Sequence, residues 1–139
     1  MTYKIIGKYI KNLEFDIPNP KTFFLLTKDI SNYKINIDIK SMQVEQKIIE
    51  VLTSLSLGST KNDFEKIKTK IIYSTIIELN SEQIQKEEIE KIILIKVPTE
   101  IYSEVRQIFV FLFENSGFKD IKINETVDFE KLYKMRKTQ

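Results

Sequence analysis

The sequence of 139 residues contains no cysteine and no histidine, and only three glycines and three prolines. Without His and Cys the chain cannot form a Ser-His or Cys-His nucleophile, a thiol redox centre or the usual zinc site. It also lacks a Gly-rich phosphate loop, so we expect no metal and no cofactor. The scarcity of Gly and Pro predicts few tight turns and long helices and strands.

Long apolar runs are missing as well. Lys4, Lys8 and Lys11 interrupt the N-terminal apolar residues, and no segment approaches the roughly 18 apolar residues of a membrane helix. We therefore expect a cytoplasmic protein without membrane insertion. With 42% hydrophobic and 30% charged residues, the chain can bury one core but is too short for two ordinary domains, which predicts a single domain over residues 1–139.

Four segments in the first half alternate between apolar and polar residues with a period of two, which is typical of half-buried antiparallel strands. They span about residues 2–16, 33–44, 45–57 and 63–79, with a turn at 58–62 before the last. The side chains expected on the apolar faces are Ile5, Tyr9, Leu13 and Phe15 in the first strand, Tyr33, Ile35, Ile37 and Ile39 in the second, and Ile49, Val51, Leu55 and Leu57 in the third. In the fourth, Lys66, Lys68 and Lys70 project opposite Ile67, Ile71 and Tyr73.

The second half changes to helical spacing. Charged pairs four residues apart follow Ser81 and predict a short exposed helix up to about Lys91. Residues 92–97 are expected to be extended or irregular. Pro98 suits the first turn of a longer helix that ends near Gly117.

Apolar side chains surround this longer helix completely between Ile108 and Phe113. A four-stranded sheet can cover only one side of such a helix, so the other side requires a second protein surface. The predicted oligomer interface consists of Ile101, Tyr102, Val105, Ile108, Phe109, Leu112 and Phe113. A buried strand over 108–113 is the alternative, because β-branched and aromatic residues suit either state.

The most informative stretch for function is Tyr-Ile-Lys-Asn-Leu-Glu-Phe-Asp-Ile-Pro-Asn-Pro at residues 9–20. Glu14 and Asp16 occupy one face of the strand, Leu13 and Phe15 occupy the other, and Pro18 ends it. The apolar run 23–26 then falls in an expected loop. Four large apolar side chains in a loop either fold back onto the core or remain available to a partner.

Three motifs in this order resemble the SecB family, the tetrameric chaperones of protein export. The first is the 9–20 string, which departs from the family at Asn12 and at the early Pro20. The second is Val-Pro-Thr-Glu-Ile-Tyr-Ser-Glu-Val-Arg at 97–106, which matches at Pro98 and Arg106. The third is Gly-Phe at 117–118 followed by Val-Asp-Phe-Glu-Lys-Leu-Tyr at 127–133, and the three motifs together cover nearly the whole chain.

The resemblance implies an α+β fold: a four-stranded antiparallel sheet with the long helix packed on one face and a C-terminal lid helix near 128–135. Two such sheets would pair, and two dimers would enclose the long helices between them, giving a homotetramer assembled as a dimer of dimers. The helix that is apolar on all sides agrees with that arrangement.

The function implied is that of an ATP-independent molecular chaperone, a holdase that binds unfolded precursor proteins and keeps them competent for Sec-dependent export. Its client groove would lie between the lid, the segment that follows the first strand, and the second strand. Carried over by position, the client-binding residues are Phe15, Phe23, Phe24, Leu25, Leu26, Ile30, Tyr33, Ile35, Ile37, Leu132 and Tyr133.

Release in the family depends on SecA, the translocase motor, which docks on an acidic face of the sheet. Glu14 and Asp16 would form that docking site here. Three features weaken the match: Asn12 and Lys66 stand where acids are expected, and the net charge is +2 rather than strongly negative. They leave open a second SecB-like role, in which the chaperone serves one antitoxin of a toxin-antitoxin system and does not dock on SecA.

Single features of the sequence are compatible with two further functional classes. The lysine row of the fourth strand, with Lys4 and Lys8, could follow a phosphate backbone, but acids nearly balance the bases, so no nucleic-acid partner is expected. An enzyme using Asp38, or Glu14 with Asp16, would need a neighbouring group that shifts a pKa, and the sequence shows none. The chain is therefore not expected to be an enzyme.

Overall fold

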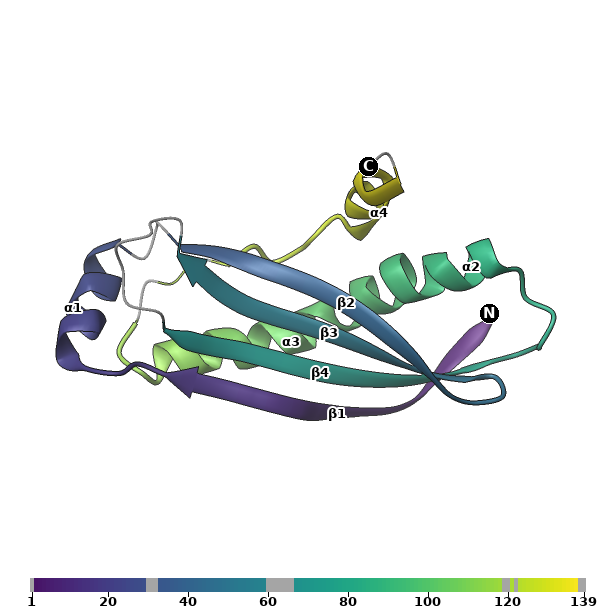
Figure 1. The fold of residues 1–139 in the computed structure, drawn as a ribbon, viewed down its shortest axis with the longest axis horizontal. Helices are drawn as coiled ribbons and strands as arrows, with labels where there is room; N and C mark the ends of the chain where they lie inside the picture. Colours follow the sequence, from purple (N-terminus) through teal and green to yellow (C-terminus); the bar gives the residue numbers. More distant parts are fainter. Residues whose placement is uncertain (1, 30–32, 60–66, 119–120, 122, 138–139) are drawn as a thin grey trace.

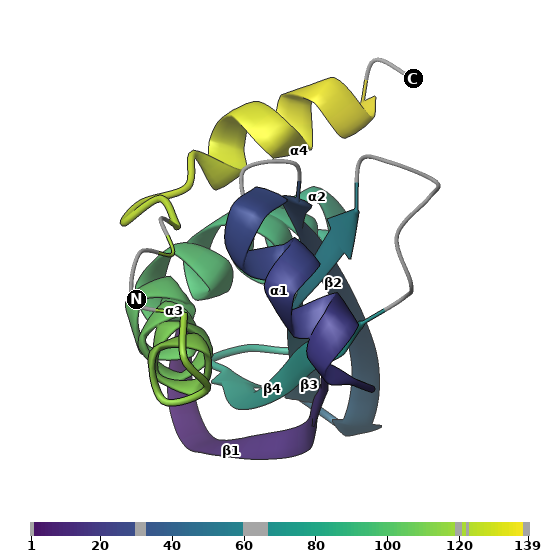
Figure 2. The ribbon, with the colours of Figure 1, turned by 90° about the vertical axis from the view of Figure 1, so that its left-hand side faces the viewer.

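Four strands form one antiparallel sheet in the order β1-β4-β3-β2, and a helical layer lies on one face of it (Figures 1 and 2). The computed structural model describes residues 2–29, 33–59, 67–118, 121 and 123–137. The strands are β1 (Tyr3–Asp16), β2 (Tyr33–Glu45), β3 (Ile48–Ser59) and β4 (Lys68–Leu79). The helical segments are α1 (Pro20–Asp29), α2 (Lys86–Lys91), η2 (Ile92–Lys96), α3 (Val97–Glu114) and α4 (Phe129–Lys137). The predicted α+β class is confirmed.

The core lies between the sheet and α3, because alternate strand residues face the helix. Val51 and Leu55 of β3 and Ile71 and Ile77 of β4 are completely buried, as the period-two pattern predicts. The predicted inward residues of β3 are all buried. The predicted turn at 58–62 needs revision, because Gly58 belongs to β3. Residues 60–62 of that turn lie outside the described residues. The same holds for residues 63–66 of the predicted fourth strand.

The short helix, the segment expected to be irregular and the long helix form one continuous helical run from α2 through η2 to α3. The prediction for residues 92–97 is therefore wrong. Pro98 is tolerated because the helix widens to a π turn just before it: the Val97 N–H bonds to the carbonyl of Ile92, five residues back. The Thr99 hydroxyl donates to the Ile95 carbonyl at 2.6 Å. None of the described helices is long and apolar enough to cross a membrane.

The expected loop after β1 is instead the helix α1. Asn19 caps it, because the Thr22 N–H donates to Asn19 Oδ1 at 2.8 Å and Pro20 supplies a fixed φ at the first helical position. Helical spacing then turns Leu26 into the core, where its side chain is completely buried, and leaves Phe24 61% exposed. The apolar run thus divides between core and surface.

Aromatic rings connect α1 to the end of α3 and to β1. The Phe113 ring lies 5.0 Å from Phe15 and 5.8 Å from Phe118, and Phe118 lies 5.0 Å from Phe23, between ring centroids. Gly117 ends the helical run with a φ of 97°, and a Cβ there would come within 3.1 Å of the Phe23 ring. Glycine is required at this turn by both conformation and space.

Strand β1 carries two bulges, between Ile5 and Gly7 and between Ile10 and Asn12. Each extra residue reverses which side chains face the helices. Ile5, Leu13 and Phe15 therefore face the helical layer as predicted, but Tyr9 lies opposite Ser74 on the outer face of the sheet. The prediction that Tyr9 shares the inner face is wrong, because strict alternation ignores the bulges.

A carboxylate on the outer face of the sheet ties β1 to β4, its neighbour, and to β3, the next strand. Glu50 of β3 is only 7% exposed and accepts hydrogen bonds from Tyr9 at 2.6 Å, from Ser74 of β4 at 2.7 Å and from Lys11 at 3.1 Å. The hydrogen bonds from Tyr9 and Ser74, together with that from Lys11, lower the pKa of Glu50. We call these four residues the Glu50 cluster.

The inner side of β1 is held to α3 by further polar contacts. Tyr3 donates to Glu100 at 3.1 Å, and Lys8 forms an ion pair with Glu104 at 2.7 Å. Burial and the bond to Glu100 raise the pKa of Tyr3 to about 12. Strand β1 is thus fixed on both faces, although its outer edge has no neighbouring strand among the described residues.

Candidate functional site

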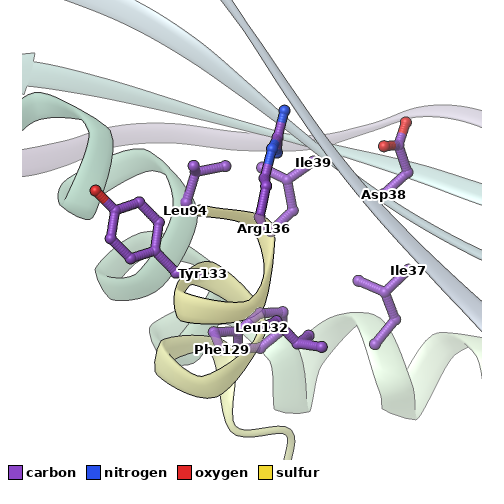
Figure 3. Close-up of a pocket in the computed structure, with 8 residues that line it drawn as sticks. All are labelled: Ile37, Asp38, Ile39, Leu94, Phe129, Leu132, Tyr133 and Arg136. Carbon is purple, nitrogen blue, oxygen red and sulfur yellow. The ribbon is translucent and has the colours of Figure 1, made fainter. Parts of the chain in front are cut away.

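The principal site is a groove between strand β2, the η2 turn and helix α4. A first hollow, with a volume of about 180 Å³, is lined by Ile37, Asp38, Ile39, Leu94, Phe129, Leu132, Tyr133 and Arg136 (Figure 3). A second, of about 390 Å³, is lined by Ile39, Lys40, Ser41, Glu90, Ile93, Leu94 and Arg136. Ile39, Leu94 and Arg136 belong to both, so the two hollows adjoin and form one groove, which we call the β2 groove.

Helix α4 is positioned by the segment that precedes it. The Tyr102 hydroxyl of α3 donates to the Asn124 carbonyl at 2.7 Å, and the guanidinium of Arg106 donates twice to the Ile123 carbonyl, at 3.0 and 3.1 Å. Asp128 then caps α4 by accepting the Lys131 N–H at 3.0 Å. These contacts anchor the start of α4 on α3.

The two sides of α4 have different roles. Phe129 and Tyr133, four residues apart, are buried, and the Phe129 ring meets Tyr102 edge-on at 5.9 Å between centroids. Leu132, which is 44% exposed, and Arg136 lie on the next strip of the helix and line the groove. The helix is therefore attached through Phe129 and Tyr133, which also form part of the groove lining, and Leu132 and Arg136 extend that lining (Figure 3).

The opposite wall is the edge strand β2. Ile37 and Ile39 are half-buried on the face toward the helices, whereas Asp38 and Lys40 are exposed on the other face. The groove thus has an apolar floor with charges at its margins, of both signs: Asp38, Lys40, Glu90 and Arg136. Such a site can bury apolar side chains of a chain that lies along β2 and pair a charge of either sign.

The predicted client-binding residues fall into separate groups. Ile37, Leu132 and Tyr133 meet in the β2 groove, and Ile35 lies half-buried on the same face of β2. Phe15, Phe23 and Leu26 instead pack at the α1 end of the molecule, which is remote from α4 in Figure 1.

Four predicted client residues remain. Leu25 is half-buried and Phe24 is exposed, both on α1. Ile30 lies outside the described residues, and Tyr33 begins β2 but its side chain is likewise outside the described part. In the β2 groove the structure therefore brings together the predicted residues that β2 and α4 contribute.

Sequence reasoning missed Ile39, Leu94, Phe129 and Arg136 as groove residues. Ile39 continues the alternation of β2 and could have been included with Ile37. Arg136 stands four residues after Leu132, on the same side of α4, which helical spacing could have indicated. Leu94 was not selected, because its segment was expected to be irregular rather than helical.

The predicted docking acids, Glu14 and Asp16, are exposed on the outer face of the sheet. Their partners in the β1–β4 register are Lys70 and Lys68, so each acid stands directly opposite an exposed lysine. Opposite charges at paired strand positions attract each other. The local field at this end of the sheet is consequently mixed rather than acidic.

The predicted oligomer residues are mostly inside the subunit. Ile101, Tyr102, Val105, Phe109 and Phe113 are all at most 4% exposed, and only Ile108 and Leu112 are partly accessible. The first five belong to the core of this subunit, where Phe113 contacts Phe15 of β1 and Tyr102 contacts Phe129 of α4. The exposed apolar residue of α3 is Phe111, at 62%.

The fold of this chain resembles that of a solved protein. A solved SecB-like chaperone of Mycobacterium tuberculosis, in complex with a peptide from an antitoxin, superposes with a TM-score of 0.65 over 91% of this chain and 88% of that one. Its sequence identity is 10%, so the likeness concerns the fold. The chain therefore has the fold of a SecB-like chaperone.

The sequence comparisons identify the family. The profile described as preprotein translocase subunit SecB matches residues 1–139. A Pelagibacter ubique chain provisionally named protein-export protein SecB is 40% identical over 96% of both chains. The protein-export protein SecB of Rhodospirillum centenum is 25% identical over 92% of this chain and 75% of its own. The chain belongs to the SecB family, of which it is a divergent member.

Proposed function

We propose that this protein is an ATP-independent holdase that binds unfolded precursor proteins in the β2 groove and keeps them competent for Sec-dependent export. The observation that carries this proposal is the groove itself. Ile37, Ile39, Leu94 and Leu132 form an apolar surface beside an open strand edge. Unfolded chains offer both apolar side chains and unpaired backbone, whereas folded proteins have already hidden them.

Binding at one groove is weak and unselective on energetic grounds. A fully buried Leu or Phe contributes about 1.5 to 3 kcal/mol, and ordering of the client opposes this gain. Several grooves on one assembly that engage the same long client raise the effective affinity. The holdase proposal therefore includes self-association into a homotetramer.

An apolar strip for a second copy lies along β1 and α3. Ile6, Ile10 and Leu13 are exposed large apolar residues of β1. Phe111 lies two helical turns after Glu104, which contacts Lys8 of β1, and so faces the same side of α3. Exposed apolar residues on an unpaired edge strand favour association with another protein surface.

Delivery to SecA through Glu14 and Asp16 is the second part of the proposal. The names of the curated relatives, which refer to protein export, support it. The lysines opposite both acids favour instead the alternative, a SecB-like chaperone for the antitoxin of a toxin-antitoxin system that does not dock on SecA. The solved neighbour was determined with an antitoxin peptide.

The test of holding uses Leu132→Ser, with Met135→Ser as the matched control. Both residues are exposed apolar side chains of α4, but only Leu132 lines the first hollow. We expect the Leu132 variant to bind an unfolded precursor about tenfold or more weakly, since it loses roughly 1.5 kcal/mol of apolar burial. The Met135 variant should bind within about threefold of the unmodified protein, because substitutions of exposed residues outside a site usually have small energetic effects. Failure of the unmodified protein to delay the refolding of a slow substrate, even in excess, would refute the proposal.

The test of delivery compares SecA binding by the unmodified protein and by the Lys68→Glu, Lys70→Glu double variant. The export role predicts that the unmodified protein binds SecA and that the double variant, with a more acidic face, binds more tightly. A protein that holds precursors but binds SecA in neither form would exclude delivery. The antitoxin role would then remain, and binding of an antitoxin peptide would test it.

A further inference from the structure

Helix α4 carries the excess positive charge of the whole chain. Its nine residues include four of the 22 basic side chains and one of the 20 acidic ones, so the rest of the chain has 18 basic and 19 acidic side chains. From Lys131 to Lys137 no acidic residue occurs. A short helix with net charge +3, on a chain that is otherwise nearly neutral, produces a local positive field.

The charged side of α4 points away from the β2 groove. Lys134 and Met135 stand three and four residues after Lys131, so the three share one side of the helix. All three are exposed, and none of them lines either hollow of the groove. Phe129 and Tyr133 are buried on the opposite side. Figures 1 and 2 show α4 at the periphery of the molecule, where an extended surface can reach its outward side.

Neighbouring acids neutralise little of this charge. Glu130 forms an ion pair with Lys134 at 3.6 Å, but both side chains are at least 65% exposed, and such a pair contributes little in water. Asp128 caps the first turn by accepting the Lys131 N–H. The acids thus lie at the start of α4 and the cations in its later turns, an order that the helix dipole favours.

Exposed apolar side chains accompany the cations, since Leu132 is 44% exposed and Met135 is 51% exposed. Helices that lie on anionic membranes combine these two features: their cations meet phosphate headgroups, and their apolar side chains enter the boundary below. The phosphate backbone of a nucleic acid would attract the lysines but would give the apolar side chains no surface in which to bury. We infer that the outward side of α4 binds the headgroup surface of a membrane that contains anionic phospholipid.

This contact is peripheral, and at a single helix it is weak. Each lysine or arginine close to an anionic surface raises the partition coefficient about fivefold, and salt screens the attraction beyond about 8 Å at physiological ionic strength. Self-association, as proposed above, would present several α4 helices to one membrane and strengthen the contact. The inference goes beyond the holdase function and does not depend on it, because Lys131 and Lys134 line neither hollow of the groove.

The test measures co-sedimentation of the full chain with vesicles of phosphatidylcholine alone and with vesicles that contain about one-third phosphatidylglycerol. At low salt we expect binding to the anionic vesicles to be about tenfold or more stronger. The Lys131→Gln, Lys134→Gln double variant should bind the anionic vesicles about tenfold or more weakly than the unmodified protein. The matched control is the Lys21→Gln, Lys28→Gln double variant, which removes the same charge from exposed positions of α1 and should bind within about threefold.

Holding is measured on the same variants. Both double variants should delay the refolding of a slow substrate as well as the unmodified protein does, which shows that they are folded and separates membrane binding from holding. Absence of binding to anionic vesicles at low salt would overturn the inference, whatever the result for holding. Equal losses of vesicle binding in the two double variants would overturn it as well, because α4 would then have no special part.

A third variant separates a membrane from other polyanions. Met135→Ser leaves every charge in place and removes apolar surface, so it should weaken vesicle binding about threefold or more and leave retention on a single-stranded oligonucleotide unchanged. Unaltered vesicle binding by this variant would show that no apolar contact is made. Tighter binding of the unmodified protein to the oligonucleotide than to the anionic vesicles would assign the cations to nucleic acid. Either result contradicts a membrane-binding α4.

Discussion

The two edges of the sheet are constructed differently. Strand β1 is bulged twice, is held on its outer face by the Glu50 cluster and is fixed to α3 by Tyr3 and Lys8. Strand β2 pairs with β3 without a register shift from Tyr33 to Gln43, and its groove-side residues lie beside α4 without any such cluster among the described contacts. The molecule therefore fixes one edge and leaves the other adjacent to a groove.

This difference indicates a division of tasks between the edges. A bulged, fixed edge with exposed Ile10 and Leu13 can present a constant apolar surface to another copy of the chain. A groove with an apolar floor beside an open strand edge can accept chains of varied sequence, because burial of apolar surface does not require one particular side chain. Three experiments, given from the largest expected effect to the smallest, test this division.

The largest effect is expected for Leu13→Asp on β1. A carboxylate placed in an apolar contact must lose its hydration without a partner, at a cost of several kcal/mol. We expect the dissociation constant of self-association to rise about a hundredfold or more, close to 3 kcal/mol, by light scattering over a dilution series. Met42→Asp on β2, another exposed apolar strand residue, is the control and should leave the mass unchanged. A Leu13 variant of unaltered mass would remove β1 from the interface.

An intermediate effect is expected for Glu50→Ala. The change leaves the hydroxyls of Ser74 and Tyr9 and the Lys11 ammonium without their acceptor, and a buried donor left unpaired costs about 1 to 3 kcal/mol. We predict a loss of about 2 kcal/mol in the free energy of unfolding, from urea titrations at fixed protein concentration. Asp38→Ala on β2 removes an exposed carboxylate and should change stability by less than about 0.5 kcal/mol. Equal losses in both variants would mean that β1 is not specially fixed.

The smallest effect concerns pH. Hydrogen bonds from Tyr9 and Ser74 lower the pKa of Glu50 in the folded state below its ordinary value of 4.5. Because the pKa of Glu50 is lower in the folded state than in the unfolded state, the ionised carboxylate stabilises the fold at pH values above the unfolded-state pKa. This stabilisation is lost as the pH falls through the folded-state pKa.

The measurement compares the unmodified protein with Glu50→Gln, which keeps the shape but cannot ionise. At pH 7 the unmodified protein should be more stable by about 1 kcal/mol, and the difference should shrink as the pH falls below 4.5. A difference that stays constant down to pH 3 would show that ionisation of Glu50 does not stabilise the β1 attachment.

Much of the fold could be predicted from local pattern. The alternation of β2 and β3 and the Pro98-to-Gly117 helix were foreseeable because a half-buried strand or helix repeats its apolar residues at the period of its backbone. The α1 helix was missed although Asn19 and Pro20 form a helix start signal, since the four apolar residues that follow have no clear helical spacing. The bulges of β1 left no signal that the alternation alone could detect.

The candidate site was predictable only in part. Ile37, Leu132 and Tyr133 were selected correctly as neighbours, from a family resemblance in which lid and strand face each other. Leu94 could not be assigned to the groove, because its place depends on how α4 lies against η2, whereas Arg136 could have been added from its spacing of four residues after Leu132. Leu26 and Phe109 appeared available in sequence and are buried by packing.

The sequence by itself determined the strands, the long helix and the family, because backbone periodicity and short motifs are local properties. Only the tertiary structure decided which apolar residues are core and which are surface, and which strand edge is fixed and which lies along a groove. Those features depend on distant segments: Glu50 joins three strands, and α4 reaches β2 from the far end of the chain. Contacts between residues so far apart in the sequence produce no periodic pattern of residue types along the chain.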